Sequence, residues 1–424
     1  MASIIWNRRA FYLLTVLVWL RGVAPGAVNY VSEYHLSSNV ADAVGRAPQA
    51  ANVAIVCSLA LSVGSVLIVL FARPSEGSKF PSLVLLCAVP LYAAGAYAIG
   101  DRLTHNIAID SLTLIVVLVA VFRLNPQLNF LSIIIYLATL TAGYSVIFAL
   151  LAPSHAFFGY AHGVFYDADK AIVGSELLAG PFGHSNTLGI YLALSLPFAL
   201  YVSNRIRRIA MMGFCFFVIL WTGSRSAIIA ALIGLAVTFV VSRTAISARR
   251  SVATLGLAAV GLTAAVLPFV VTDPRAFTTR GAIWQGSLQV WSRSPLFGGG
   301  PDWYSRIAEY ANDLGAQASS GHNLVVTLLA TGGIASLVLV AGVLFGSGSR
   351  AGTAFEQENS LVPFYYLVSF LTVSATEYVW VFDTRGELFL MVGFLLSCLL
   401  LSKASRAPVA PVMLHGKAEV TRSV

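Results

Sequence analysis

A single arginine interrupts the apolar stretch from 209 to 241, and its position is unusual for a charge. The residues around it, TGSRS at 222–226, separate two short apolar segments whose outer flanks are both basic. This pattern indicates a hairpin whose tip, with Arg225, lies within the depth of the membrane, where charges are costly and usually functional. Arg225 also begins a helix, where free N–H groups and the helix dipole attract anions, which predicts a phosphate or pyrophosphate site. The alternative is a side chain that extends to the membrane interface without a ligand.

Arg280 is the second arginine that stands out. It opens a predicted amphipathic helix in which Trp284, Leu288 and Trp291 recur at helical spacing, so we expect this helix to lie on the outer membrane surface. Three glycines at 298–300 follow the helix, and they are more typical of a bare turn than of an anion cradle. A solvated salt bridge is the alternative role for Arg280.

Two polar pairs stand directly before apolar runs, at the ends of long loops. His184 and Asn186 precede one run, and His322 and Asn323 precede another. Because a histidine exchanges protons near neutral pH, His322 is a candidate general base that would activate a hydroxyl group. The dipole of the helix that it precedes should keep its imidazole neutral. The other three residues, with Ser224, are predicted substrate contacts, and a plain interfacial position is the alternative for each histidine.

The sequence gives little support for a metal or a cofactor. Asp167 and Asp169 have the D-x-D spacing that can hold a divalent cation, but this pair alone is a weak pattern. The four cysteines each lie inside an apolar run and not at the spacing of metal ligands, which is typical of packed structural thiols. We therefore expect no metal site, no cofactor and no disulfide.

The elements that must position these residues are membrane helices. Of the 424 residues, 58% are apolar and only 10% are charged, whereas about 25% are charged in an ordinary soluble domain. The mean hydropathy of +0.81 agrees. This composition excludes a soluble globular enzyme, a disordered chain and a disulfide-stapled secreted module. We predict an all-α integral membrane protein with about twelve transmembrane helices, at 10–28, 51–71, 81–99, 109–122, 128–151, 187–202, 209–221, 226–241, 252–271, 323–345, 361–378 and 388–401.

The distribution of basic residues predicts which side of the membrane each loop faces. With the N-terminus inside, sixteen of the 26 lysines and arginines fall in inner loops and ends, as the positive-inside rule requires. The C-terminal segment 402–424 is then a cytoplasmic tail. The two long loops, 152–186 and 272–322, are extracytoplasmic, and loops of this length are usually functional. The prediction is a single membrane domain, 1–424, whose chemistry faces outward.

Four short motifs occur in order along the chain. They are GHSNTLG at 183–189, GSRSA at 223–227, the stretch from Arg280 through Trp284 to PLFG at 295–298, and His322-Asn323 followed by Gly332-Gly333. Together they resemble the superfamily of bacterial O-antigen ligases and O-antigen or exopolysaccharide polymerases. The twelve-span layout, with its largest outer loop before the tenth span, is similar as well. The resemblance covers about 183–345, and the first five spans are similar in hydropathy alone.

The resemblance implies an inverting, metal-independent glycosyltransferase of the bacterial cytoplasmic (inner) membrane. Such an enzyme transfers a glycan from a polyprenyl pyrophosphate carrier, such as undecaprenyl pyrophosphate, to an acceptor hydroxyl on the outer side. Arg225 and Arg280 would bind the pyrophosphate and stabilise its developing charge. His322 would act as the base or orient the acceptor. The implied partners are the lipid-linked donor, a glycan or lipid A–core acceptor and membrane lipids, with no nucleic acid.

The acceptor is left open at this stage. Lipid A–core would make the protein a ligase, a growing polysaccharide a polymerase, and a protein acceptor an oligosaccharyltransferase. The segment 183–189 is somewhat similar to that of exopolysaccharide polymerases, which favours polymerisation. The alternative of a different class is a twelve-span transporter or lipid-linked glycan flippase, which needs midplane ionisable residues and related halves. Asp110 and Glu377 are the only acids within the predicted spans, and no internal repeat is visible.

Overall fold

The computed structural model describes residues 2–31, 48–72, 79–100, 102–158, 160–161, 164–165, 168–310 and 320–403. Most of this part of the chain is helical. The main helices are α1 (Ala2–Val31), α2 (Pro48–Phe71), α3 (Phe80–Ile99), α4 (His105–Leu124), α5 (Ile133–Leu151), α7 (Ser185–Ser195), α8 (Arg205–Trp221), α9 (Arg225–Arg243), α10 (Ile246–Val270), α11 (Ala276–Arg293), α13 (Leu324–Glu358) and α14 (Val362–Ser374). Shorter helical pieces are η2 (Leu128–Ser132), α6 (Pro153–Ala156), η3 (Ala168–Lys170), η4 (Leu196–Tyr201), α12 (Trp303–Tyr310), η5 (Leu390–Phe394) and α15 (Leu395–Leu401).

Each of the twelve apolar runs predicted from the sequence contains a helix. Eight helical segments of the described chain are long and apolar enough to cross a membrane, namely α1, α2, α3, α4, η2 with α5, α9, α10 and α13. Two more apolar segments, α14 and η5 with α15, are shorter. The protein is therefore a mostly helical membrane protein, and twelve crossings remain a prediction.

The outer helices present apolar side chains to their surroundings. On α2, Ile55, Leu59 and Leu70 are each about two-thirds exposed, at 64%, 66% and 66%. Water would make such a surface costly, whereas lipid tails are as apolar as these side chains. The exposed face of α2 is therefore the face expected of a helix in contact with lipid.

Small residues let the inner helices pack closely. Gly234 of α9 lies against Tyr365 and Ser369 of α14, where any side chain would collide with them. The hydroxyl of Ser369 donates to the backbone carbonyl of Ala230, at 3.3 Å. The two helices are therefore antiparallel, because the earlier residue of α9 meets the later residue of α14. The first turn of α9 lies beside the last turn of α14. Close approach at small residues is common between membrane helices.

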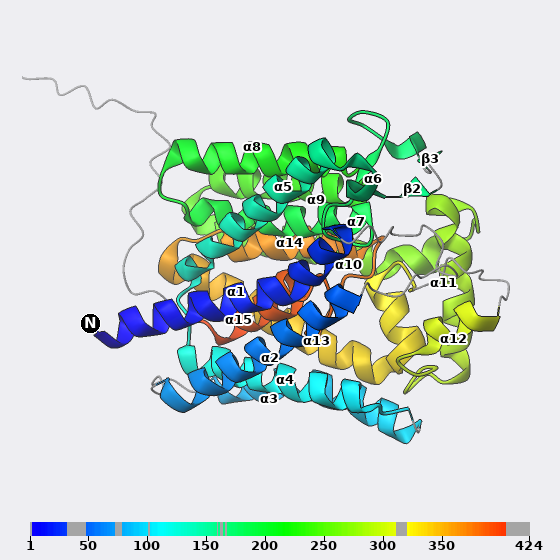
Figure 1. The fold of residues 1–424 in the computed structure, drawn as a ribbon. Helices are drawn as coiled ribbons and strands as arrows, with labels where there is room; N and C mark the ends of the chain where they lie inside the picture. The colour runs from blue at the N-terminus through cyan, green and yellow to red at the C-terminus, as the bar shows by residue number, and fades with distance from the viewer. Residues whose placement is uncertain are drawn as a thin grey trace, which may run out of the picture.

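The non-spanning segments gather at one end of the helical body (Figure 1). They include α11, α12 and two short antiparallel strand pairs, β1 (Phe157–Phe158) with β4 (Leu177–Leu178) and β2 (Tyr160–Ala161) with β3 (Val164–Phe165). The described parts of the two segments predicted as long loops thus lie on one side of the bundle. That this side faces outward remains a prediction.

A break in α13 docks the loop that follows α11. Gly333 has φ 60° and ψ −161°, a conformation that essentially only glycine adopts. The break frees the backbone N–H of Ile334, which donates to the carbonyl of Pro295 at 2.9 Å. In return Gly299 donates its N–H to the carbonyl of Ala330 at 2.7 Å. The glycines at 298–300 therefore form a docking turn, consistent with the bare turn favoured by the sequence.

Candidate active site

Glu377 connects several of the residues that the sequence singled out. It lies three residues beyond the end of α14, with its side chain 10% exposed. Its Oε1 atom accepts from Arg280 Nη2 at 2.5 Å and from Asn186 Nδ2 at 3.2 Å. Its Oε2 atom lies 3.3 Å from His322 Nδ1. One carboxylate thus holds side chains from α7, α11 and the loop before α13.

The charge state of Glu377 follows from these neighbours. Burial alone would raise the pKa of its carboxyl, because a desolvated carboxylate is costly. The hydrogen bond with His322 and the positive charges of Arg280, His322 and His184 outweigh burial and lower the pKa below its ordinary value. Glu377 is therefore an anion at neutral pH, and it offsets part of the positive charge of the arginine and histidines.

His322 is held by a turn in an uncommon backbone conformation. Its φ is 44°, in the left-handed region that few non-glycine residues adopt and that histidine adopts more readily than most. Its N–H donates to Ser320 Oγ at 3.3 Å, and the N–H of Gly321 donates to Thr327 Oγ1 at 3.0 Å. The side chain is 24% exposed. With Nδ1 directed at Glu377, the other ring nitrogen, Nε2, has no hydrogen-bond partner among the described residues and is open to a ligand.

Arg280 is aimed by a left-handed turn that the sequence did not predict. Three consecutive residues, Phe277, Thr278 and Thr279, have φ of 53°, 60° and 68° within α11. After this kink, the N–H of Ala282 returns to the carbonyl of Pro274 at 3.0 Å. The amphipathic helix expected at this place is confirmed, but its kinked first turn is new. Such strain persists only where the surroundings enforce it, and here it brings Arg280 to Glu377.

Arg225 is the first residue of α9 and lies at the same end of the bundle, because α9 begins where α14 ends. The sequence placed Arg225 at a hairpin tip within the depth of the membrane, and that depth stays a prediction. In the structure its side chain is exposed, and the 19 residues of α9 are long and apolar enough to cross a membrane. We call Glu377 and its partners Arg280, Asn186 and His322 the Glu377 group. The backbone of Arg225 lies at the same end of the bundle as this group, and its side chain is exposed.

Three residues predicted as substrate contacts cap helices in the structure, and their contact with substrate stays a prediction. His184 Nδ1 accepts from the N–H of Asn186 at 3.0 Å, and its ring packs on Phe158 with centroids 3.9 Å apart. Ser224 Oγ accepts from the N–H of Ala227 at 3.4 Å. These are N-cap contacts, which satisfy free N–H groups at a helix start.

Asn323 is fully buried, and its predicted contact with substrate stays a prediction. Its Oδ1 accepts from the N–H of Val326 at 3.1 Å, capping α13. Its Nδ2 donates to the carbonyls of Ala264 and Ala375, each at 2.9 Å. Ser224 is likewise fully buried. Both residues therefore fix helix ends, and Asn186 alone of the four has its side chain on Glu377.

The D-x-D pair falls partly outside the described chain. Asp167 is not among the described residues, and Asp169 is exposed in η3. Within the part that the structure describes, no three His, Cys, Asp or Glu side chains are grouped so as to hold a metal ion. Metal independence is untested by this and stays a prediction.

The sequence placed Glu377 inside the predicted span 361–378. There it counted as one of the two intramembrane acids that a transporter would need. In the structure α14 ends at Ser374, so Glu377 lies in the connection that follows. The available signal was a lone acid at the edge of an apolar run, since such acids usually have a partner or a function. Its partners are distant in sequence, so no spacing pattern could name them.

Comparison with known proteins shows that part of the chain is similar to one family. Residues 209–341 match the family model described as O-antigen ligase. The match begins in α8 and ends in α13, so it includes Arg225, Arg280 and His322 but not Asn186 or Glu377. A search of curated proteins found no match. The match confirms the resemblance to the O-antigen ligase superfamily.

Proposed function

We propose that this member of the O-antigen ligase superfamily, a mostly helical membrane protein, transfers a glycan from a polyprenyl pyrophosphate carrier to an acceptor hydroxyl on the outer side of the bacterial inner membrane. The observation that carries the proposal is the group around Glu377. It places a histidine with one open nitrogen beside an arginine, at the end of the bundle where a second arginine is exposed.

His322 is suited to serve as the base. When Nδ1–H donates to the carboxylate of Glu377, Nε2 carries a lone pair that can take the proton of an acceptor hydroxyl. The 3.3 Å contact with Glu377 fixes this tautomer and the direction of the ring. Glu377 also stabilises the imidazolium that forms, because its carboxylate is already ionised. Glu377 is thus a positioning residue for the base.

The transfer balances without an additional reagent. The acceptor oxygen loses its proton to His322 Nε2 and attacks the anomeric carbon of the donor. The bond between that carbon and the pyrophosphate oxygen breaks, and the electron pair leaves with the pyrophosphate. Attack from the opposite face inverts the anomeric centre. The proton on His322 can then pass to the departing phosphate or to water.

Arg280 and Arg225 are suited to the leaving group. A guanidinium presents five N–H donors, so Arg280 can keep its contact with Glu377 and still donate to a phosphate oxygen. Arg225 is exposed and adds a second fork from the start of α9. Two fixed positive charges stabilise a pyrophosphate anion as it develops, which is why the proposal needs no metal.

The alternative of a transporter or flippase is less well supported by the positions of its acids. Asp110 is held in the second turn of α4 by the hydroxyl of Thr384, at 2.5 Å, and by Arg385 Nε, at 3.1 Å. Glu377 lies beyond the end of α14. Neither acid is at the middle of a helix, where a transport pathway would need it.

The acceptor decides between the named activities, and a deletion strain tests them. Loss of all surface polymer would identify a polymerase, as the segment 183–189 favours, and polymer left on its lipid carrier would identify a ligase. Purified protein with a lipid pyrophosphate donor tests the chemistry directly. Product of inverted anomeric configuration, formed in EDTA, is expected. A strain with unchanged polymer and unchanged carrier-linked glycan would contradict the proposal.

A further inference from the structure

A cavity of about 450 Å³ adjoins the Glu377 group. It lies between α3, α13 and the segment 378–386, with the start of α12 at its edge. Its volume is within the range of about 300–1,000 Å³ that is typical of small-molecule sites. The structure therefore provides a second space, next to the group that holds His322.

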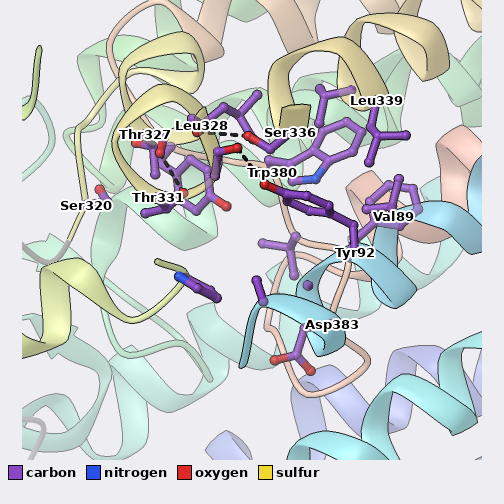
Figure 2. Close-up of a pocket in the computed structure, with 18 of the residues that line it drawn as sticks. Val89, Tyr92, Ser320, Thr327, Leu328, Thr331, Ser336, Leu339, Trp380 and Asp383 are labelled. Atoms are coloured by element: carbon purple, nitrogen blue, oxygen red, sulfur yellow. Dashed lines mark hydrogen bonds between the residues drawn. The ribbon is translucent and has the colours of Figure 1, made fainter. Parts of the chain in front are cut away.

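The lining of the cavity combines aromatic faces with hydroxyls and one carboxylate. Tyr92 and Trp380 both line the cavity, and Figure 2 shows Ser320 and Thr327 on one side of it and Asp383 on another. Saccharides present two kinds of surface that suit this lining, namely apolar C–H faces that pack on aromatic rings and hydroxyls that form hydrogen bonds. The Asp383 carboxylate favours saccharide hydroxyls over an apolar polyprenyl chain, because a chain packed on it would desolvate a charged group.

The walls are held in place before any ligand binds. Tyr92 donates its hydroxyl to the carbonyl of Gly332 at 2.7 Å, which fixes its ring between α3 and α13. Trp380 stacks on Phe382 with centroids 4.7 Å apart and an interplanar angle of 15°. Asp383 Oδ1 accepts from the backbone N–H of Arg385 at 2.8 Å and from Arg385 Nε at 3.4 Å, which fixes the carboxylate in the wall. A fixed wall lowers the entropy cost of binding.

The cavity and the site share chain segments. Ser320 lines the cavity and is two residues from His322. Tyr378 lines the cavity and follows Glu377 directly. We propose that this cavity binds the terminal saccharide of the acceptor and directs one of its hydroxyls to His322. The assignment rests on the proposed function, because only a glycosyl transfer needs an acceptor saccharide beside the base.

Narrowing the cavity from one wall tests the assignment. Ala96 of α3 lines the cavity, whereas Ala98 on the same helix is exposed and does not. The Ala96→Phe variant should fill part of the space, and Ala98→Phe is its matched control. Short radiolabelled oligosaccharides, prepared from the surface polysaccharide of the host cell, are dialysed to equilibrium against each purified protein. We expect Ala96→Phe to weaken their binding at least about tenfold and Ala98→Phe to leave it unchanged.

The transfer assay separates the two glycans that take part. Filling an acceptor site should raise the KM for the acceptor about tenfold in Ala96→Phe and leave the KM for the donor unchanged. A raised KM for the donor alone would overturn the acceptor assignment, as would oligosaccharide binding that is equal in both variants. An unchanged elution profile and thermal midpoint exclude misfolding as the cause of any loss.

The two proposals fail in different ways. Wild-type protein that transfers glycan but binds no free oligosaccharide, with both KM values unchanged in Ala96→Phe, would remove the saccharide site and leave the transfer proposal standing. Oligosaccharide binding that Ala96→Phe abolishes, in a protein without transfer activity, would support the cavity and remove the proposed reaction.

Discussion

At the scale of single residues, Glu377 couples the stability of the site to acid. Burial would raise the pKa of its carboxyl, but His322 and Arg280 lower it below the ordinary value of 4.5 in the folded protein. The fold therefore stabilises the ionised form. This contribution is complete above about pH 4.5 and is lost as the pH falls through the lower folded pKa.

We accordingly expect the thermal midpoint of the wild type in detergent to fall more steeply than that of Glu377→Gln as the pH decreases below about 4.5. Glu377→Gln removes the titrating group but keeps its size and an acceptor for Arg280. Glu356→Gln is the control, since Glu356 forms a half-exposed pair with Arg250. Equal slopes for the wild type and Glu377→Gln would contradict the role given to these contacts.

The base assignment predicts a specific pH signature. His322→Gln should lose about 10²- to 10⁴-fold in kcat, because a positioned base contributes that much to attack by a hydroxyl. The acidic limb of the pH–rate profile should disappear with it. His105→Gln, at the exposed start of α4, should retain both rate and limb. A His322→Gln variant that keeps the limb and loses less than about tenfold would show that His322 only orients the acceptor, and His184 would be the next candidate.

The arginines should differ from their neighbours in the loop. Arg280→Ala and Arg225→Ala should each lower kcat/KM by tens to thousands of fold, equivalent to about 2–5 kcal/mol, at unchanged protein level. Arg280→Lys should restore activity in part, since an ammonium cannot form the same bidentate fork. Arg275→Ala, exposed at the start of α11, should be near normal. Near-normal transfer by Arg225→Ala would move the pyrophosphate site away from the start of α9.

At the scale of elements, the break at Gly333 lets the loop that follows α11 form backbone hydrogen bonds with α13. Gly333→Ala should lower the free energy of unfolding by about 1–3 kcal/mol or more, because φ 60° with ψ −161° is strained for alanine. The new Cβ would also collide with the backbone of Leu296. Gly348→Ala on the same helix would meet only Leu257, at an ordinary 3.5 Å, and should be tolerated. Equal thermal midpoints for the two variants would show that the break is not required.

The sequence predicted elements better than contacts, for a physical reason. Hydropathy reports the environment of each residue, so the positions of the helices followed from it directly. The residue types of Arg280 and His322 were conspicuous at the ends of predicted loops, so the sequence identified both of them. The left-handed turn at 277–279 and the Glu377 contacts could not be predicted, because they depend on which helix ends meet in space. Helix ends are also the least certain part of any sequence assignment, and both Arg225 and Glu377 lie at one.

At the scale of the whole molecule, the orientation can be measured. We expect the end that carries α11 to face outward, because the basic loops favour the opposite end for the cytoplasm. Thr272→Cys, exposed before α11, should react with an impermeant thiol reagent in intact cells. Ser247→Cys, exposed in the first turn of α10, should react only in opened cells. The reverse pattern would rule out transfer on the outer side.

The caps of three helices have a consequence for the electric field at this end of the protein. The helices α7, α9 and α13 begin here, and their cap side chains, His184, Ser224 and Asn323, accept N–H groups without carrying negative charge. Aspartate caps a helix about as well as serine or asparagine and would cancel part of the dipole. Caps without negative charge leave the partial positive charges of three helix starts uncancelled. An anion entering from the membrane therefore meets an attractive potential that belongs to the backbone and outlasts any change in the protonation of the side chains.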